Sequence, residues 1–560
     1  MSASGRWPPG WSSGTGREVA AARAAVATTD RYASEVGLRV LRRGGNAVDA
    51  AVASAFALAV VNPEAGNLGG GGFLVVRRPA GSLLALDFRS QAPGAADRTM
   101  YTRPGVDRSE ASLLGHLSAA VPGSVAGFWE AHRKLGSMAW SELVEPAVRL
   151  ARGFRVGKRF ARSFPERIVE GLRRFPHSAS VFLPEESGGR PAPPRLGRLF
   201  CQPELARTLE RIRDRGADGF YRGETARCIV EEMRSGGGII TRADLESYRT
   251  AWREPVCSPY AGHDIVSMPP SSSGGIALAL SFRIAAALGL AGEEWHGAGH
   301  IHLLAETWRR AYADRNHHLG DPAFVEVPAD GLVDSGYARD RARTISREAA
   351  TPSAEVGPGD PAATGGRHTT HLSVIDPGGG AASLTTTLNT WYGSKLAVPG
   401  AGFLLNNEMD DFTVEPGTPN AFGLVQGQAN AIASGKRMLS MMTPTIVLNP
   451  SGGLQMVVGT PGGATIMTTV FQIISNVLDY GMPLAEAVLA PRVHHQHFPD
   501  RIAYEPGGLR RRAREALCAL GHRLHEEEEP WGDVQAIAVV RDGSLRAVSD
   551  PRRGGTALGF

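Results

Sequence analysis

The stretch of sequence that decides the fold is Arg367-His368-Thr369-Thr370-His371-Leu372-Ser373-Val374-Ile375-Asp376. Before it, residues 351–366 are rich in Pro, Gly, Ala and Thr, which is typical of a loop. After it, residues 369–375 and 381–389 are two predicted strands joined by a glycine-rich turn. A threonine pair between a loop and a buried strand is an unusual place for core residues. It suggests the hypothesis that the chain cuts itself before Thr369, which then becomes an N-terminal nucleophile.

An N-terminal threonine carries its own general base. The free α-amino group has a pKa near ~8 and lies beside the hydroxyl, so it can accept the hydroxyl proton. In self-cleavage, Thr369 Oγ attacks the His368 carbonyl and water hydrolyses the resulting ester. The predicted products are residues 1–368 and 369–560. Taken alone, the threonine pair favours an ordinary β-branched strand residue over self-cleavage.

The composition is that of a globular protein and excludes several other classes. The chain has 560 residues, of which 42% are hydrophobic and 21% charged. The formal net charge is only +4 and arginine is spread along the chain, so nucleic-acid binding is not indicated. The 4 cysteines form no CxxC pair, which predicts buried free thiols and neither a metal site nor a disulfide framework. No cofactor is expected.

The N-terminal residues and the apolar runs bear on localisation. No apolar run approaches the roughly 18–20 residues of a membrane span, so no membrane association is expected. Residues 1–17 are polar and are predicted to form a disordered tail. They lack the apolar segment of a secretory signal, which predicts a cytoplasmic protein. A misassigned start codon would leave a periplasmic or secreted location open.

The order of predicted elements favours two sheets between helix layers. Helices are predicted within residues 19–61, with 47–61 buried on all sides, and over 465–478. Two hairpins are predicted at 73–88 and 443–459. The run Gly69-Gly70-Gly71-Gly72 lacks the ending of a phosphate loop, so it predicts close backbone packing near a site.

Further motifs follow one another in order along the chain. They are Gly44–Ala51, Gly66–Phe73, Asp87–Arg89, Val121–Gly127, Asp314-Arg315, Gly320–Pro322, Thr369–His371, Thr385–Asn389, Asn406–Phe412 and Pro461–Gly463. From about residue 18 onward the chain resembles the γ-glutamyltranspeptidase family, the glutathione hydrolase proenzymes, which are N-terminal nucleophile hydrolases. The resemblance implies an α+β fold, the αββα four-layer sandwich. It also implies self-cleavage between His368 and Thr369 into a large subunit, 18–368, and a small catalytic subunit, 369–560, which stay together as a heterodimer.

The resemblance also implies roles for individual residues. Catalysis would use the nucleophile Thr369, the supporting hydroxyl of Thr387, and the backbone amides of Gly462 and Gly463 as an oxyanion hole. Substrate binding would use Arg89 and Ser440 for the α-carboxylate, and Asp411, Glu408 and Asn389 for the α-amino group. The implied reaction passes the γ-glutamyl group of glutathione, or of a related amide, through a γ-glutamyl-Thr369 ester to water, an amino acid or a peptide.

Two residues depart from the family pattern and keep alternatives open. Met441 stands where the family has a second serine, and a thioether is a poor hydrogen-bonding group, which predicts weakened carboxylate recognition. Phe422 stands where some bacterial relatives have tyrosine in the loop that covers the site, which predicts a looser lid. One alternative is an amidase of the same fold with another acyl specificity, like glutaryl-cephalosporin acylase. The other is an unprocessed paralogue that only binds ligand.

Overall fold

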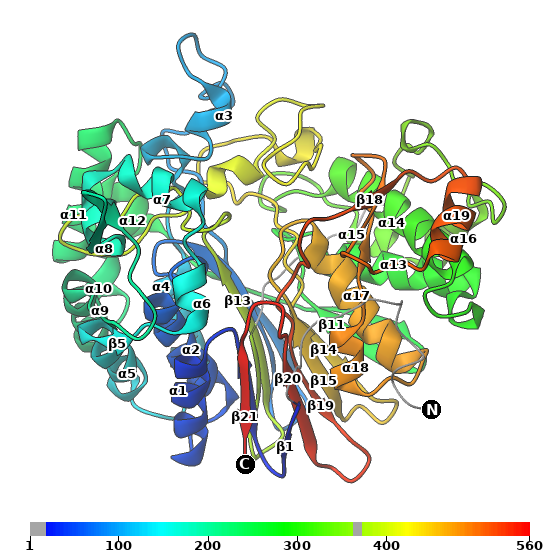
Figure 1. Cartoon of the computed structure of the whole chain (residues 1–560), viewed down its shortest axis with the longest axis horizontal. Coiled ribbons are helices and arrows are strands. Elements are labelled where there is room, and N and C mark those ends of the chain that lie inside the picture. Colours follow the sequence, from blue (N-terminus) through cyan, green and yellow to red (C-terminus); the bar gives the residue numbers. More distant parts are fainter. Residues whose placement is uncertain (1–17, 362–371) are drawn as a thin grey trace.

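Two seven-stranded antiparallel sheets lie face to face at the centre of the molecule, with helices on both outer faces (Figure 1). This computed structural model describes residues 18–361 and 372–560. The strand order is β21-β2-β12-β13-β3-β4-β9 in the first sheet and β1-β20-β19-β15-β14-β11-β10 in the second. The predicted αββα sandwich is therefore confirmed. The proposed tail, the cleavage site and Thr369 lie outside the described residues.

The first sheet joins segments from both sides of the predicted cleavage point. Its strands are β2 (Ala25–Thr28), β3 (Gly71–Arg77), β4 (Leu83–Phe88), β9 (Ala251–Arg253), β12 (Ser373–Ile375), β13 (Ala381–Thr387) and β21 (Thr556–Gly559). The central pairs are β12 with β13 and β13 with β3. Strands 373–375 and 381–387 are thus hydrogen-bonded into a sheet whose other members all precede the predicted cleavage point, except the C-terminal strand β21.

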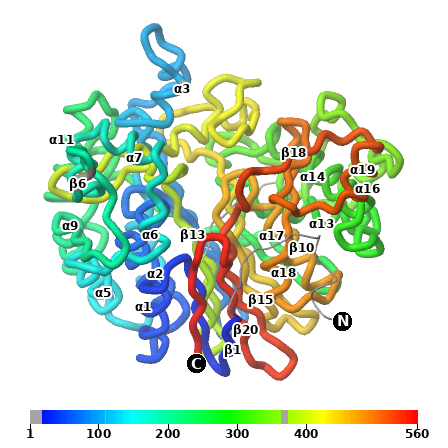
Figure 2. The backbone as a smooth tube through the Cα atoms, viewed as in Figure 1, coloured from blue at the N-terminus to red at the C-terminus, as the bar shows by residue number. Residues whose placement is uncertain are grey.

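The second sheet contains the hairpin of β14 and β15 that was predicted from the sequence. Its strands are β1 (Glu18–Ala21), β10 (Val256–Tyr260), β11 (His263–Ser267), β14 (Thr445–Leu448), β15 (Leu454–Gly459), β19 (Gln535–Val539) and β20 (Leu545–Ser549). In Figure 2, β1 and β21 approach each other although they come from opposite ends of the described chain.

The alternation of side chains along β3 explains the layering. Phe73 and Val75 pack in the cluster between the two sheets, whereas Leu74 and Val76 pack against the helices of the outer face. Successive strand residues point to opposite faces, so a strand covered on both sides is apolar throughout. Burial of both faces of the sheet therefore explains why Phe73 to Val76 of β3 are all apolar.

One helix layer covers the first sheet. Its core is α2 (Ala47–Val61), whose residues are all buried and whose N-terminus is closed by a capping box between Asn46 and Asp49. The longer helices around it are α1 (Arg31–Arg42), α4 (Ser124–Leu135), α5 (Trp140–Arg152), α7 (Glu166–Arg173), α9 (Pro203–Arg215) and α11 (Gly223–Gly236). The shorter helices and strands of this part are α3 (Arg108–Ala111), α6 (Lys158–Arg162), α8 (Pro176–Phe182), α10 (Asp218–Tyr221), α12 (Arg242–Ser247), β5 (Phe154–Arg155), β6 (Glu185–Ser187), β7 (Arg190–Ala192) and β8 (Leu199–Phe200).

The other helix layer covers the second sheet. The buried helices α13 (Gly274–Leu288), α14 (Ala298–His318) and α17 (Thr465–Leu478) form its core, and α17 has the predicted bounds. Its remaining elements are α15 (Ala329–Leu332), α16 (Ser335–Arg343), α18 (Leu484–Leu489), α19 (Arg511–Ala519), β16 (Val493–His494), β17 (Ile502–Tyr504) and β18 (Leu524–Glu526). Among the described helices, none is long and apolar enough to cross a bilayer.

Two predictions from the sequence were wrong. Residues 19–28, expected to be helical, form β1 and β2. Their alanines favour a helix locally, but Ala21, Ala25 and Ala27 fill the narrow space between the sheets, so tertiary packing overrides propensity. The cysteines are free as expected, but only Cys228 is buried.

The glycine run brings the end of β13 close to the segment that follows β4. A Cβ atom at Gly70 would lie 1.9 Å from the Thr387 carbonyl oxygen, and one at Gly71 would lie 2.4 Å from the Ser90 nitrogen. Only glycine permits such an approach. The predicted close backbone packing is confirmed, and it sets Thr387 near Arg89, the residue before Ser90.

Candidate active site

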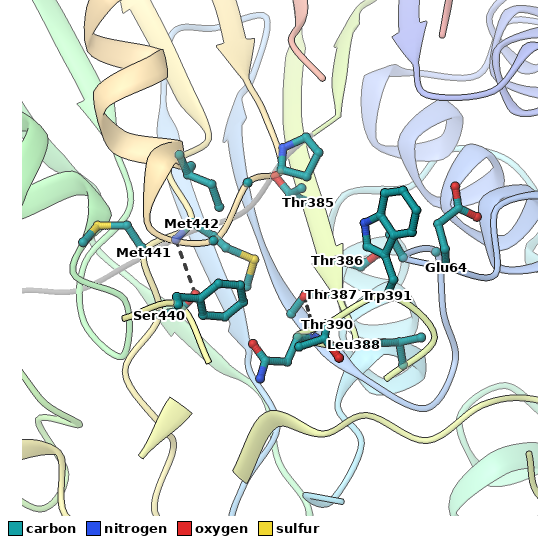
Figure 3. Close-up of a pocket in the computed structure, with 18 of the residues that line it drawn as sticks. Glu64, Thr385, Thr386, Thr387, Leu388, Thr390, Trp391, Ser440, Met441 and Met442 are labelled. Atoms are coloured by element: carbon teal, nitrogen blue, oxygen red, sulfur yellow. Dashed lines mark hydrogen bonds between the residues drawn. The ribbon is translucent and has the colours of Figure 1, made fainter. Parts of the chain in front are cut away.

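A cavity of about 640 Å³ opens at the end of β13, between elements of both sheets (Figure 3). Its lining contains most of the residues that the sequence singled out: Arg89, Thr387, Asn389, Asp411, Ser440, Gly462 and Gly463. These residues come from positions far apart in the chain. The fold therefore gathers the predicted site residues in one place, apart from Thr369, which is not described, and Glu408, which lies behind Arg89.

Arg89 follows β4 and is completely buried. Its guanidinium forms an ion pair with Glu408, with Nη1 2.9 Å from Oε2, and a second ion pair through Nη2 with Asp411. Its Nε lies 3.4 Å from the Met438 carbonyl oxygen, to which it donates. These contacts hold the guanidinium between two carboxylates.

Glu408 and Asp411 belong to one short helical turn, Glu408–Asp411. The backbone N–H of Gly71 donates to Glu408 Oε1 at 3.3 Å, and Asn420 Nδ2 donates to Asp411 Oδ1 at 3.4 Å. Burial raises the pKa of both carboxyl groups, and that of Asp411 reaches about 7 although Arg89 opposes the shift. The buried Arg89 guanidinium thus lies between two carboxyl groups that burial makes harder to ionise.

Ser440 and Met441 are neighbours in the chain, and both line the cavity. The Met442 N–H donates to Ser440 Oγ at 3.3 Å, the contact drawn in Figure 3. The Ser440 carbonyl accepts from the Ser273 hydroxyl at 2.6 Å, which fixes the backbone. Met441 also lines the cavity, and its sulfur accepts from the Ser273 hydroxyl at 3.6 Å. The position of the family's second serine therefore presents a thioether at the cavity wall.

Gly462 and Gly463 lie just before the N-terminus of α17. Within the described chain, neither backbone N–H donates a hydrogen bond to another residue. Two free amides beside a helix N-terminus attract negative charge. Gly463 has φ +59°, and a Cβ there would lie 2.4 Å from the Phe422 ring. Phe422 therefore packs directly on the glycine turn, as part of the loop over the cavity.

Thr387 ends β13, and its Oγ1 accepts from the Asn389 N–H at 2.8 Å. Asn389 adopts φ +77° and donates through Nδ2 to the Asn407 carbonyl at 3.0 Å. The Leu384 N–H donates to the Leu372 carbonyl at 2.6 Å, so the described chain resumes beside β13, three residues before Thr387.

Arg315 belongs to the Asp314-Arg315 motif, for which the sequence predicted no role. Arg315 is buried on α14 and lines the cavity. Its Nε donates to Ser273 Oγ at 2.9 Å and its Nη1 donates to Gln426 Oε1 at 2.6 Å. Burial lowers its pKa to about 10. Arg315 thus links Ser273, which holds the Ser440 backbone, to Gln426 in the loop over the cavity. The sequence signal that could have identified it is an arginine on a helix face with buried neighbours.

One possible metal-binding group occurs among the described residues, away from the cavity. His302, Glu306 and His522 bring one ligand atom each to within 4.8 Å of one another. However, Glu306 already pairs with Arg309 and Arg310, and His302 Nδ1 lies 2.8 Å from His522 Nε2. Neighbouring side chains thus already use these groups, and no metal role is assigned to them.

The fold and the cavity at the end of β13 define an N-terminal nucleophile hydrolase type of sandwich. The family described as gamma-glutamyltranspeptidase matches residues 33–560. The chain is 45% identical to the glutathione hydrolase proenzyme of Pseudomonas aeruginosa, over 95% of this chain and 94% of that protein. It is 42% identical to the glutathione hydrolase proenzyme of Escherichia coli, over 95% and 91%. The crystal structure of cephalosporin acylase from Bacillus halodurans superposes with a TM-score of 0.84 at 26% identity, covering 99% of each chain. The chain belongs to the γ-glutamyltranspeptidase family.

Proposed function

We propose that the chain is a self-processing γ-glutamyl hydrolase and transferase that acts on glutathione and related γ-glutamyl amides. The observation that carries the proposal is the buried Arg89–Asp411 ion pair in the cavity wall. A γ-glutamyl head group is a zwitterion. Its α-carboxylate can take the place of Asp411 on Arg89, while its ammonium pairs with Asp411. The exchange replaces one ion pair by two and leaves no buried charge without a partner.

The other substrate contacts follow from the same orientation. Glu408 stays paired with Arg89 and keeps its guanidinium in place. We propose that Ser440 contacts the α-carboxylate and that Asn389 contacts the ammonium; both residues line the cavity. The γ-amide is then left at the end of β13, where Thr387 lies and where we place the new N-terminus, Thr369.

In the proposed reaction, Thr369 Oγ attacks the γ-carbonyl carbon and the α-amino group of Thr369 takes the hydroxyl proton. The free amides of Gly462 and Gly463 stabilise the oxyanion, and each such donor contributes about 2.7–4 kcal/mol in comparable acyl-transfer sites. The C–N bond breaks, the amine leaves with the proton, and a γ-glutamyl-Thr369 ester forms. Water or a second amine then attacks the ester and regenerates the hydroxyl.

Maturation uses the same hydroxyl. We propose that Thr369 Oγ attacks the His368 carbonyl and that the His368–Thr369 peptide bond breaks, which frees the Thr369 amine and forms an ester. Water then hydrolyses the ester, so that the chain becomes two fragments that remain one sandwich. The interleaving of strands supports a stable heterodimer: β12 and β13 of the smaller fragment pair with β2 and β3 of the larger one.

A second candidate is an amidase that prefers another acyl group, such as glutaryl. Met441 in the cavity wall favours it, because a thioether binds a carboxylate poorly. Asp411 opposes it, because a glutaryl group has no ammonium to pair with this carboxylate once its own carboxylate occupies Arg89.

Donor profiling separates the two candidates. We expect kcat/KM for an L-γ-glutamyl anilide to exceed that for the matched glutaryl anilide. In Asp411→Asn the ratio of kcat/KM for the γ-glutamyl anilide to kcat/KM for the glutaryl anilide should fall by roughly 30-fold or more. The reason is that truncating one partner of a buried charged contact costs about 2–5 kcal/mol. A wild-type enzyme that prefers the glutaryl donor would contradict the assignment.

The raised pKa of Asp411 predicts a pH effect that depends on the donor. Since burial lifts that pKa to about 7, the carboxylate that pairs with the ammonium is lost as the pH falls below about 7. We expect kcat/KM for the γ-glutamyl donor to fall more steeply below pH ~7 than kcat/KM for the glutaryl donor. Comparing donors cancels the titration of the Thr369 amine, which both share. Parallel profiles would count against a role for Asp411 in binding the ammonium.

A further inference from the structure

The cavity extends beyond the site for the γ-glutamyl group. In Figure 3, Glu64 and Trp391 lie on the other side of Thr386 and Thr387 from Ser440. Residues from four separate segments line this outer half. They are Glu64, Arg159, Arg167, Trp391, Lys395 and Arg553.

The charges in the outer half are not balanced. Arg159 is neutralised by Glu64 at 3.2 Å and Asp533 at 2.9 Å. Across residues 18–361 and 372–560, Arg167, Lys395 and Arg553 form no ion pair with a carboxylate within 4.0 Å. Three cations therefore face one cavity with no carboxylate paired to them.

Lys395 is the most unusual of the three. Its side chain is buried, and its Nζ donates to the Gly393 carbonyl at 2.7 Å, with Thr390 Oγ1 3.5 Å away. Burial, and to a smaller extent Arg167, lower the pKa of Lys395 to about 8. A buried ammonium without a counter-charge is costly, and a bound anion would relieve that cost.

An aromatic wall accompanies the cations. The Arg553 guanidinium lies 5.2 Å from the centre of the Trp391 ring, which holds the side chain over that surface. Trp531 lines the same cavity. Flat apolar surface next to unpaired cations suits a small organic anion.

We propose that Arg167, Trp391, Lys395 and Arg553 form a subsite for the carboxylate of the amine that leaves, or accepts, the acyl group. The favoured amines are amino acids and peptides that carry a carboxylate. This inference rests on the proposed function. The amine side of a γ-glutamyl amide points away from the head group held by Arg89, and hence toward this half of the cavity.

Two donors that share the acyl group and differ by one charge test the subsite. One is L-γ-glutamyl-4-nitroanilide and the other is L-γ-glutamyl-3-carboxy-4-nitroanilide. The quantity to measure is the ratio of kcat/KM for the anionic donor to kcat/KM for the neutral one. Lys395→Met and Arg167→Met should each lower this ratio about 3–10-fold, as expected for a partly solvated charge contact. Added salt should lower this ratio in the wild type and have little effect on it in the variant that combines Arg167→Met with Lys395→Met.

Arg207→Met provides the matched control, because Arg207 is exposed on α9 and lies outside the cavity lining. Its ratio should equal that of the wild type. Arg167 is exposed on α7, so its variant keeps the test valid even if Lys395→Met fails to fold. Cleavage of both anilides with an unchanged ratio in Arg167→Met and in any folded Lys395→Met would overturn the subsite alone. Cleavage of neither anilide by the wild type would overturn the proposed function, and the subsite with it.

Discussion

The Thr369→Ala variant is expected to remain a single chain and to release no product from a γ-glutamyl anilide. On the proposed mechanism one hydroxyl performs both reactions, and alanine removes it without adding bulk. Loss of a nucleophile that forms a covalent intermediate costs several orders of magnitude in kcat. A denaturing gel reports maturation, and a chromogenic anilide reports turnover.

Two further variants make the result specific. Thr369→Ser keeps a hydroxyl and should restore both cleavage and measurable turnover. Thr102→Ala removes an exposed threonine outside the cavity and should behave like the wild type. Cleaved Thr369→Ala protein, or turnover by it, would rule out Thr369 as the nucleophile.

Replacing Arg89 by methionine is expected to have the largest effect on substrate recognition. Methionine has similar length but cannot bind the α-carboxylate, and it leaves Glu408 and Asp411 buried without their cation. We expect kcat/KM for γ-glutamyl donors to fall by at least about 10²-fold. Breaking a buried ion pair also costs about 3–5 kcal/mol in the free energy of unfolding, so Tm should fall.

Arg552→Met separates the effect on recognition from the effect on stability. Arg552 is also buried between two carboxylates, 2.7 Å from Glu505 and 3.2 Å from Asp550, but it does not line the cavity. Its replacement should lower Tm while kcat/KM of the folded protein stays close to that of the wild type. Equal losses of kcat/KM in the two variants would mean that Arg89 acts only through stability.

Much of the fold could be predicted because local pattern and tertiary packing agree. The helix 465–478 is apolar on its buried face and has the predicted bounds, and β4 coincides with the predicted strand 83–88. The strands β1 and β2 could not be predicted, because alanine favours a helix locally and only the narrow gap between the sheets explains its use in a strand.

The site could be predicted in part. The resemblance singled out Arg89, Asp411 and the glycine pair, and the fold places them around one cavity. What it did not indicate is that Arg89 is paired with both carboxylates in the absence of substrate. Nor could spacing reveal the outer cations, since Arg167 and Arg553 lie far apart in the sequence and line the same cavity only in the folded molecule.

The most direct test of the central claim is to locate the acyl group on the enzyme. The protein is mixed with a γ-glutamyl donor, quenched with acid, and the fragments are analysed by mass spectrometry with peptide mapping. The proposed mechanism predicts a small fragment that begins at Thr369 and carries one γ-glutamyl group on that residue. A γ-glutamyl group on any other residue, or an unmodified, full-length chain that still turns over the donor, would contradict it.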